Sequence, residues 1–162
     1  MPRRQKSRKF VGYSRVSTRY QANENLSLVG QQDAISSYAT SAGQGLHGIN
    51  EDIQSASGDP LKRPGLRDAL NTAEMLKCPI LVTSVDRLSR NVAIHKILVS
   101  RGIGVWVVGE GRITRRELKK RLLVAQNWVL ARSSQAITDH ARRTAAARKK
   151  SVPDLPDARR RG

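Results

Sequence analysis

Short apolar runs and helical patterns alternate along the first two thirds of the chain. The runs have the length and the Val and Ile content of buried strands, and they lie at Lys9–Arg15, Leu46–Glu51, Pro79–Ser84 and Ile103–Val108. Apolar residues at helical spacing predict helices between them, over Leu26–Ala42, from Pro64 onward, and over Val92–Ser100. This alternation favours an α/β fold with a mostly parallel sheet of four to five strands flanked by helices.

The pattern changes after Gly111. Neither glycine nor proline occurs from Arg112 to Val152, a stretch of 41 residues. One apolar stripe runs along this stretch, made of Leu118, Leu122, Leu123, Ala125, Val129, Leu130, Ala136 and Ile137. Thr114 can cap the start of a helix, with Glu117 as its capping-box partner. A helix of about 35 residues would be on the order of 50 Å long, so we expect its far half to pack against a second copy or to lie along another partner.

Positive charge is concentrated at the two ends of the chain, whose formal net charge is +17 at pH 7. Residues 10–111 have a net charge of +1, and this nearly neutral stretch predicts a globular body. A basic extension at 1–9 precedes it, and a long basic helix at 112–150 and a disordered basic tail at 151–162 follow it. Cationic extensions favour a polyphosphate partner, because each neutralised phosphate releases condensed counterions. Solvated basic tails on an ordinary soluble protein are the plainer interpretation.

Composition argues against other classes of protein. No run of about 18 apolar residues is present, so no membrane-spanning helix is expected. The basic segment Met1–Lys9 lacks the apolar stretch of a secretory signal. The single cysteine, Cys78, cannot form an internal disulfide and fits a reducing compartment. We therefore expect a cytoplasmic protein, associated with the nucleoid if its partner is DNA.

Polar residues follow the first and third apolar runs. Tyr13, Arg15 and Ser17 share one face of the first strand, because side chains alternate along a strand. The segment Asp86–Asn91 follows the third run, and it lies at the same carboxyl edge of the sheet if the two strands are neighbours. Each group alone also fits an ordinary turn or helix cap. A third segment, Ser55–Pro64, alone resembles a flexible surface loop.

Together these groups resemble the catalytic domain of serine recombinases of the resolvase/invertase type. The likeness covers roughly Phe10 to Lys149. It rests on four groups in the family's order and near its spacing: Tyr13-Ser14-Arg15-Val16-Ser17-Thr18, Ser27-Leu28 with Gln31, Ser57-Gly58 with Arg63-Pro64, and Asp86-Arg87-Leu88-Ser89-Arg90-Asn91. The Tyr-x-Arg-x-Ser and Asp-Arg-Leu-x-Arg motifs are each fairly specific, and the ordered set is stronger than either.

The resemblance implies a site-specific recombinase that cuts and rejoins double-stranded DNA through a 5′-phosphoserine intermediate. Ser17 would be the nucleophile, and the other active-site positions would be Arg15, Gln31, Arg63, Asp86, Arg87 and Arg90. Forked guanidinium groups can stabilise the charge that develops on the nonbridging oxygens of a phosphodiester. Because the phosphoserine linkage conserves bond energy, no metal or other cofactor is expected. Arg15 or Asp86 could assist removal of the serine proton, and the sequence does not choose between them.

The same resemblance implies that the long helix mediates dimerisation and contacts DNA, in a homodimer that pairs into a tetramer. The candidate DNA-binding residues are His140, Arg142, Arg143, Arg148, Lys149 and Lys150. His140 stands in a segment where the family normally has an acidic residue followed by arginine, so it replaces a permanent positive charge with a conditional one.

The sequence shows no helix-turn-helix pattern, although small serine recombinases usually continue into such a DNA-reading module. Only twelve residues follow Lys150. We therefore expect DNA affinity with little base specificity. The alternative hypothesis is a catalytically silent recombinase remnant that binds DNA or dimerises with a full-length relative, and a generic nucleic-acid-binding α/β module is a third.

Overall fold

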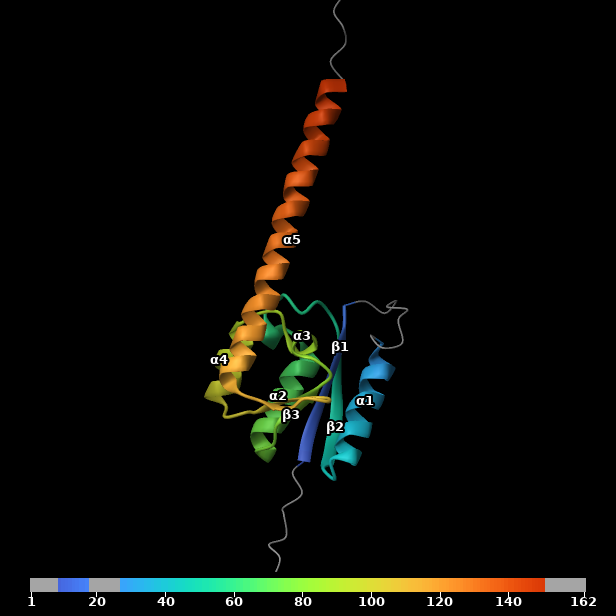
Figure 1. The fold of residues 1–162 in the computed structure, drawn as a ribbon, viewed down its shortest axis with the longest axis vertical. Coiled ribbons are helices and arrows are strands. Elements are labelled where there is room, and N and C mark those ends of the chain that lie inside the picture. Colours follow the sequence, from blue (N-terminus) through green and yellow to red (C-terminus); the bar gives the residue numbers. More distant parts are fainter. Residues whose placement is uncertain (1–8, 18–26, 151–162) are drawn as a thin grey trace, which may run out of the picture. The chain divides into compact units, whose positions relative to one another are not determined.

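A five-stranded sheet forms the centre of the protein in a computed structural model that describes residues 9–17 and 27–150, with the side chains of 148–150 outside the description. The strands are β1 (Lys9–Val16), β2 (Gly45–Ile53), β3 (Ile80–Val82), β4 (Val105–Val107) and β5 (Gly111–Ile113). Their order across the sheet is β2-β1-β3-β4-β5. The paired strands β1 and β2 lie side by side in Figure 1. The first four are parallel, which confirms the α/β class expected from the alternating pattern.

The fifth strand is antiparallel and was not predicted from the sequence. It pairs with β4 through a tight turn in which Gly109 and Gly111 have φ angles of 79° and 81°. Residues other than glycine rarely adopt this conformation, so the two glycines allow the chain to reverse here. Residues 111–113 therefore form a strand, and the long helix begins after Thr114, the residue predicted to cap it.

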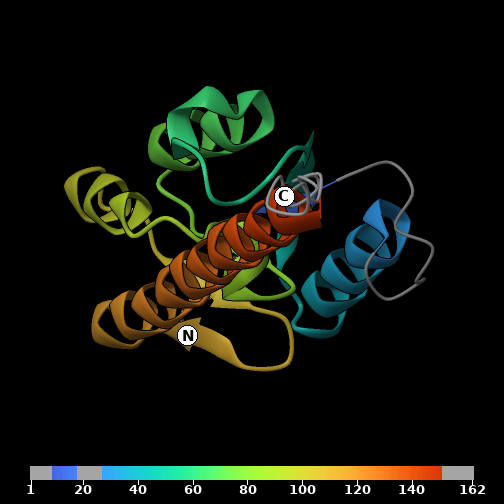
Figure 2. The same ribbon diagram turned by 90° about the horizontal axis from the view of Figure 1, so that it is seen from above.

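Helices cover both faces of the sheet (Figure 2). One face carries α1 (Leu28–Ser41), whose Ile35 and Ala39 pack with Phe10 and Leu81. The other face carries α2 (Pro64–Leu76), the single turn α3 (Val85–Leu88), α4 (Ala93–Ser100) and the first turns of α5. Apolar residues from all of these elements form the larger buried cluster on that face, which ends with Leu118 and Leu122 of α5.

The long helix α5 spans Arg115–Lys150, 36 residues. Its start is capped as predicted, because the Thr114 hydroxyl accepts a hydrogen bond of 3.1 Å from the Glu117 amide. The Glu117 carboxylate accepts from Arg121 at 2.9 Å, a contact within the helix rather than with the cap residue. The chain divides into a unit of residues 1–127 and a unit of residues 128–162, and α5 contributes to both.

Two of the predicted segments cannot be compared with the structure. The disordered tail at 151–162 and nearly all of the basic extension at 1–9 lie outside the described residues. Over the part of the chain that is described, no helix is long and apolar enough to cross a membrane.

The start of α2 lies directly against the end of β2. A Cβ atom on Gly65 would lie 2.1 Å from the main-chain oxygen of Glu51 and 2.7 Å from its carbonyl carbon. Both atoms belong to the backbone of a paired strand, so they cannot move aside as the end of a flexible side chain could. Glycine at position 65 therefore allows the α2 amino terminus to approach the strand.

We predict that Gly65→Ala lowers the free energy of unfolding by about 1–3 kcal/mol or more, since the added methyl group forces the helix and strand apart. Urea denaturation of purified protein measures the loss. Gly48→Ala is the matched control, because a Cβ there meets no atom within 4 Å and the residue has no left-handed φ angle. Equal midpoints for the two variants would contradict the close approach of α2 to β2.

Candidate active site

Three segments from distant parts of the sequence meet at the carboxyl edge of the sheet. Ser17 follows β1 and is exposed. Gln54 follows β2, which pairs with β1 as far as Val16 and Ile53. The α3 turn and the residues after it follow β3, the other neighbour of β1. The sheet order therefore places the two motif-bearing segments next to each other, as the sequence predicts.

Arg15 is the residue that joins these segments. Its guanidinium is buried, with 2% of the residue exposed. It donates three hydrogen bonds to main-chain oxygens: from Nη1 to Gln54 at 2.8 Å, from Nε to Arg87 at 3.1 Å and from Nη2 to Asp86 at 3.1 Å. One side chain of β1 thus fixes the end of β2 and the α3 turn.

Burial lowers the pKa of Arg15 to about 10, and repulsion by Arg63, Arg87 and Arg90 contributes to the same shift. Arg15 still carries its charge near neutral pH. The shift shows that the charged form is held among like charges in a poorly hydrated place.

Gln31 of α1 holds the main chain two residues before Ser17. The Gln31 side chain is 1% exposed. Its Oε1 accepts from the Arg15 amide and its Nε2 donates to the Arg15 carbonyl, both at 3.0 Å. The Arg87 guanidinium donates to the same carbonyl at 3.4 Å. The peptide groups leading to Ser17 are therefore fixed by side chains from α1 and α3.

A second buried network begins at Tyr13, two residues before Arg15 on β1. The Tyr13 hydroxyl donates to Asp52 at 2.9 Å and accepts from Arg63 at 3.1 Å. Asp52 also accepts from the amides of Gly65 and Leu66, both at 2.9 Å, so its carboxylate caps the amino terminus of α2. Burial and the Asp52 carboxylate raise the pKa of Tyr13, against the opposing effect of Arg63, and the phenol remains a hydrogen-bond donor.

Arg63 is more deeply placed than a phosphate-binding residue at the surface would be. It is 2% exposed, and its Nη1 also donates to the Leu88 carbonyl at 2.8 Å. Its Nε and Nη2 atoms are buried without a hydrogen-bond partner. A buried guanidinium with unpaired donors is unfavourable unless an acceptor can reach it.

Asp86 and Arg90 are the more exposed members of the candidate site. Their side chains are 42% and 34% exposed, and the Arg90 guanidinium lies 3.8 Å from the Asp86 carboxylate. The Ser84 hydroxyl donates to the other Asp86 oxygen at 2.7 Å. Arg87 beside them is buried. This part of the site therefore offers a partly accessible guanidinium at the sheet edge where Ser17 is exposed.

The segment that follows β2 is tied to the α3 turn. The Arg90 amide donates to the Ala56 carbonyl at 3.0 Å, and the Asn91 side chain donates to Gly58 at 3.4 Å. Ser57 forms a 2.8 Å hydrogen bond with Ser55. The loop predicted to be flexible in isolation is therefore hydrogen-bonded to the segment that carries Arg90.

The candidate DNA-binding residues lie on the second unit of the chain. His140, Arg142 and Arg143 are exposed on α5. The side chains of residues 148–150 lie outside the description, so Arg148, Lys149 and Lys150 stay sequence predictions.

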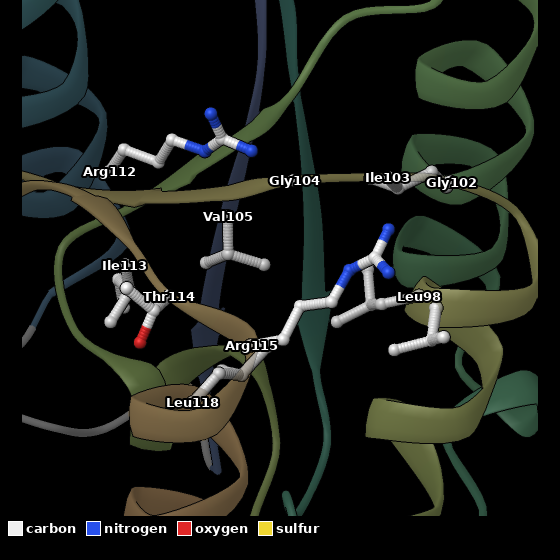
Figure 3. Close-up of a pocket in the computed structure, with 11 residues that line it drawn as sticks. Leu98, Gly102, Ile103, Gly104, Val105, Arg112, Ile113, Thr114, Arg115 and Leu118 are labelled. Atoms are coloured by element: carbon white, nitrogen blue, oxygen red, sulfur yellow. The ribbon is translucent and has the colours of Figure 1, made fainter.

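A pocket of about 440 Å³ lies away from the candidate catalytic residues (Figure 3). Its walls come from the end of α4, the segment leading into β4, and the start of α5, with Arg112 and Arg115 beside apolar residues such as Ile103 and Leu118. None of the candidate catalytic residues lines it. It is at the amino end of β4, the opposite end of a parallel strand from the edge that carries Ser17. Within the described residues, no group of three or more His, Cys, Asp or Glu side chains is placed to hold a metal ion.

Sequence reasoning missed the part played by Asp52. It lies near the end of a weak, half-exposed strand, and its partners are a tyrosine 39 residues earlier and two amides of α2 that are 13 and 14 residues later. Arg63-Pro64 could have indicated such a partner. Proline at the first helical position marks the start of a helix, and Arg63 does not cap the amides of that start with its own side chain.

The α/β body, its parallel sheet and the arginine-rich carboxyl edge define the class of protein as a serine recombinase catalytic domain. Residues 10–152 match the family model described as the resolvase N-terminal domain. The chain belongs to the resolvase family, whose general activity is site-specific DNA recombination. A comparison with curated protein sequences gave no significant match.

Solved structures share the fold. The N-terminal catalytic domain of TP901-1 integrase is 24% identical, with a TM-score of 0.58, over 80% of this chain and 99% of that one. A resolvase family site-specific recombinase from Streptococcus pneumoniae is 23% identical, with a TM-score of 0.53, over 87% of this chain and 99% of that one. The C-terminal catalytic domain of ISC1926 TnpA, an IS607-like serine recombinase, is 28% identical, with a TM-score of 0.52, over 62% of this chain and 70% of that one.

We predict that Arg15→Lys lowers the free energy of unfolding by about 1–3 kcal/mol for each main-chain oxygen left unpaired. A lysine ammonium is a single donor atom, and it cannot reach three carbonyl oxygens that a planar guanidinium spans. Urea denaturation measures the loss, with Arg67→Lys on the exposed face of α2 as the control. An Arg15→Lys variant as stable as the control would contradict the linking role of Arg15.

Proposed function

We propose that this chain cuts and rejoins double-stranded DNA by attack of Ser17 on a phosphodiester. The Ser17 hydroxyl loses its proton as its oxygen forms a bond to phosphorus. The bond from phosphorus to the 3′ oxygen breaks, and that oxygen takes up a proton and leaves as a 3′ hydroxyl. The DNA 5′ end stays attached to the enzyme as a phosphoserine. The reverse attack by a 3′ hydroxyl of another strand rejoins the DNA and releases Ser17.

One observation supports this proposal above the others. The main chain leading to the exposed Ser17 is fixed at Arg15 by Gln31 and Arg87, and the Arg15 side chain is fixed in turn by three carbonyl groups. A nucleophile held on a rigid segment loses little orientational freedom when it attacks. The hydrogen bonds that hold the main chain at Arg15 would therefore favour a reaction at Ser17.

The arginines would act at different distances from the phosphate. Arg90 is partly exposed and could contact a nonbridging oxygen directly. Arg63 is buried, so contact with a phosphate would require movement of the segment around the short turn Pro60–Lys62. Arg15 and Gln31 already bind the main chain, and we assign them the role of positioning residues for Ser17.

The basic residues of α5 would supply affinity for the DNA backbone. Arg142 and Arg143 are exposed and belong to a part of the chain with a large excess of positive charge. Apolar residues on the same helix, among them Trp128, Leu130 and Ile137, are exposed as well. We propose that this apolar set packs against a second copy, in a dimer that pairs into a tetramer on DNA.

We predict that wild-type protein, mixed with supercoiled plasmids carrying candidate sites and quenched with denaturant, is recovered covalently attached to DNA 5′ ends. Ser17→Ala abolishes the attachment, because no other atom replaces the nucleophilic oxygen. Ser14→Ala is the matched control on the same strand. Its hydroxyl is buried without a hydrogen-bond partner, so its removal leaves no group unpaired and the adduct persists.

The same experiment decides between the recombinase and the catalytically silent remnant. Adduct formation by Ser17→Ala would show that the nucleophile lies elsewhere. Wild-type protein that shifts DNA in a gel but leaves no adduct on any plasmid tested would establish the silent DNA-binding protein.

We predict that Arg142→Ala with Arg143→Ala reduces the slope of log binding constant against log salt concentration by roughly two, about 0.9 for each lost phosphate contact. Fluorescence anisotropy with labelled duplex DNA at several salt concentrations measures the slope. The exposed pair Lys119→Ala with Lys120→Ala, on the first turns of α5, is the control. If the magnitude of the salt slope decreases equally in both double variants, then the number of positive charges, and not their position on α5, determines DNA binding.

A further inference from the structure

A single side chain of α5 caps the segment that carries Arg90. The Oε1 atom of Gln126 accepts a hydrogen bond of 2.9 Å from the Val92 amide, in a partly buried position. Val92 is the cap residue directly before α4, and its own side chain makes no capping hydrogen bond. Amides at a helix start need an acceptor from elsewhere, and for Val92 that acceptor comes from a residue 34 positions later.

The capped amide is two residues from Arg90. The intervening Asn91 donates its amide hydrogen to Ser89 at 3.0 Å, and its side chain accepts from the Ala93 amide at 2.9 Å. Arg90 in turn is paired with Asp86 and donates its amide to Ala56. The chain from Val92 back to Ser89 is therefore held at several points, and the Ser89 amide donates to the Val85 carbonyl of the α3 turn at 3.0 Å. Carbonyls of that turn in turn accept from Arg15.

Other contacts join α4 to the first turns of α5. His95 shares a 3.1 Å hydrogen bond with the Arg115 carbonyl. Leu118 and Leu122 are buried in the same cluster as Ile94 and Leu98. Apolar contacts of this kind tolerate small sliding movements, whereas a hydrogen bond of 2.9 Å to one amide fixes a single distance.

We propose that Gln126 is a positioning residue for strand cleavage: it fixes the segment Asp86–Val92 relative to Ser17, so that a shift of the first turns of α5 changes the placement of Arg90. This inference rests on the function proposed above and assigns a regulator of the same site. A DNA or partner contact made by α5 would then alter the rate of the chemical step as well as the affinity for DNA. Gln126 itself needs no contact with the phosphate.

The test uses two substitutions with opposite expectations. Gln126→Met keeps the length of the side chain and removes the oxygen acceptor. Gln126→Glu keeps an acceptor, and its negative charge is favourable at a helix amino terminus. Gln135→Met, at an exposed position of α5, makes the same chemical change away from α4.

Hydrogen exchange of the Val92 amide in the full-length protein without DNA reports on the contact itself. We expect exchange at least tenfold faster in Gln126→Met, and unchanged exchange in Gln126→Glu and Gln135→Met. Single-turnover formation of the covalent adduct at saturating plasmid then reports on positioning. We expect the rate to fall about tenfold in Gln126→Met with an unchanged dissociation constant for DNA, and to be restored in Gln126→Glu.

The possible failures are distinguishable. Unchanged Val92 exchange in Gln126→Met, or faster exchange with an unchanged adduct rate, would overturn the positioning role alone. Weaker DNA binding with an unchanged adduct rate at saturation would overturn it in favour of a DNA contact by Gln126. Absence of any wild-type adduct would overturn the proposed function, and this role with it.

Discussion

The burial of one guanidinium determines how the candidate site is built. Arg15 lies near the end of the central strand, and its three hydrogen bonds to main-chain oxygens join elements that are adjacent only through the sheet order. A guanidinium can do this because its donors point in fixed, divergent directions within one plane. Removing a charged group from water is unfavourable by several kcal/mol unless its donors are paired. At this edge of the sheet, the segments after β2 and β3 are therefore placed so that their carbonyl oxygens pair with Arg15.

The neighbouring network of Tyr13, Asp52 and Arg63 also buries charged groups, and it pairs them in a different way. Here a buried carboxylate accepts from a phenol and from two amides at the start of α2, so the helix terminus compensates its negative charge. Gly65 makes the arrangement possible by allowing α2 to approach β2. Both networks start on β1, from residues two positions apart that point to the same side of the strand. The alternation of side chains along β1 thus places Tyr13 and Arg15, and with them both networks, on one face of the sheet.

The sequence predicts the parts of this arrangement that depend on periodicity. The first four strands, the three main helices and the Thr114 cap follow from apolar spacing and local turn chemistry. The strand β5 and the turn α3 do not, because neither is an apolar run: β5 is Gly111-Arg112-Ile113, and α3 is a single turn that contains Asp86 and Arg87. Gln31 was identified through its motif, but the pattern could not show that its amide pairs with the Arg15 main chain. Asp52 was missed because its partners come from distant segments: Tyr13 of β1, and two amides that reach it only once α2 is folded against β2.

The charges at the site are not balanced within the protein. Arg15, Arg63 and Arg87 are buried close together, and Asp52 is the buried carboxylate of the described residues that faces them. Burial lowers the pKa of Arg15, and repulsion among the arginines adds to this shift. Two donor atoms of Arg63 have no acceptor. Such an arrangement is unfavourable in itself, and under the function proposed above a bound anion would offset it. Bound anion and folded protein would then stabilise each other, since any ligand that binds only the folded state adds to its stability. A phosphodiester placed beside Ser17 would supply the negative charge that this group of arginines lacks.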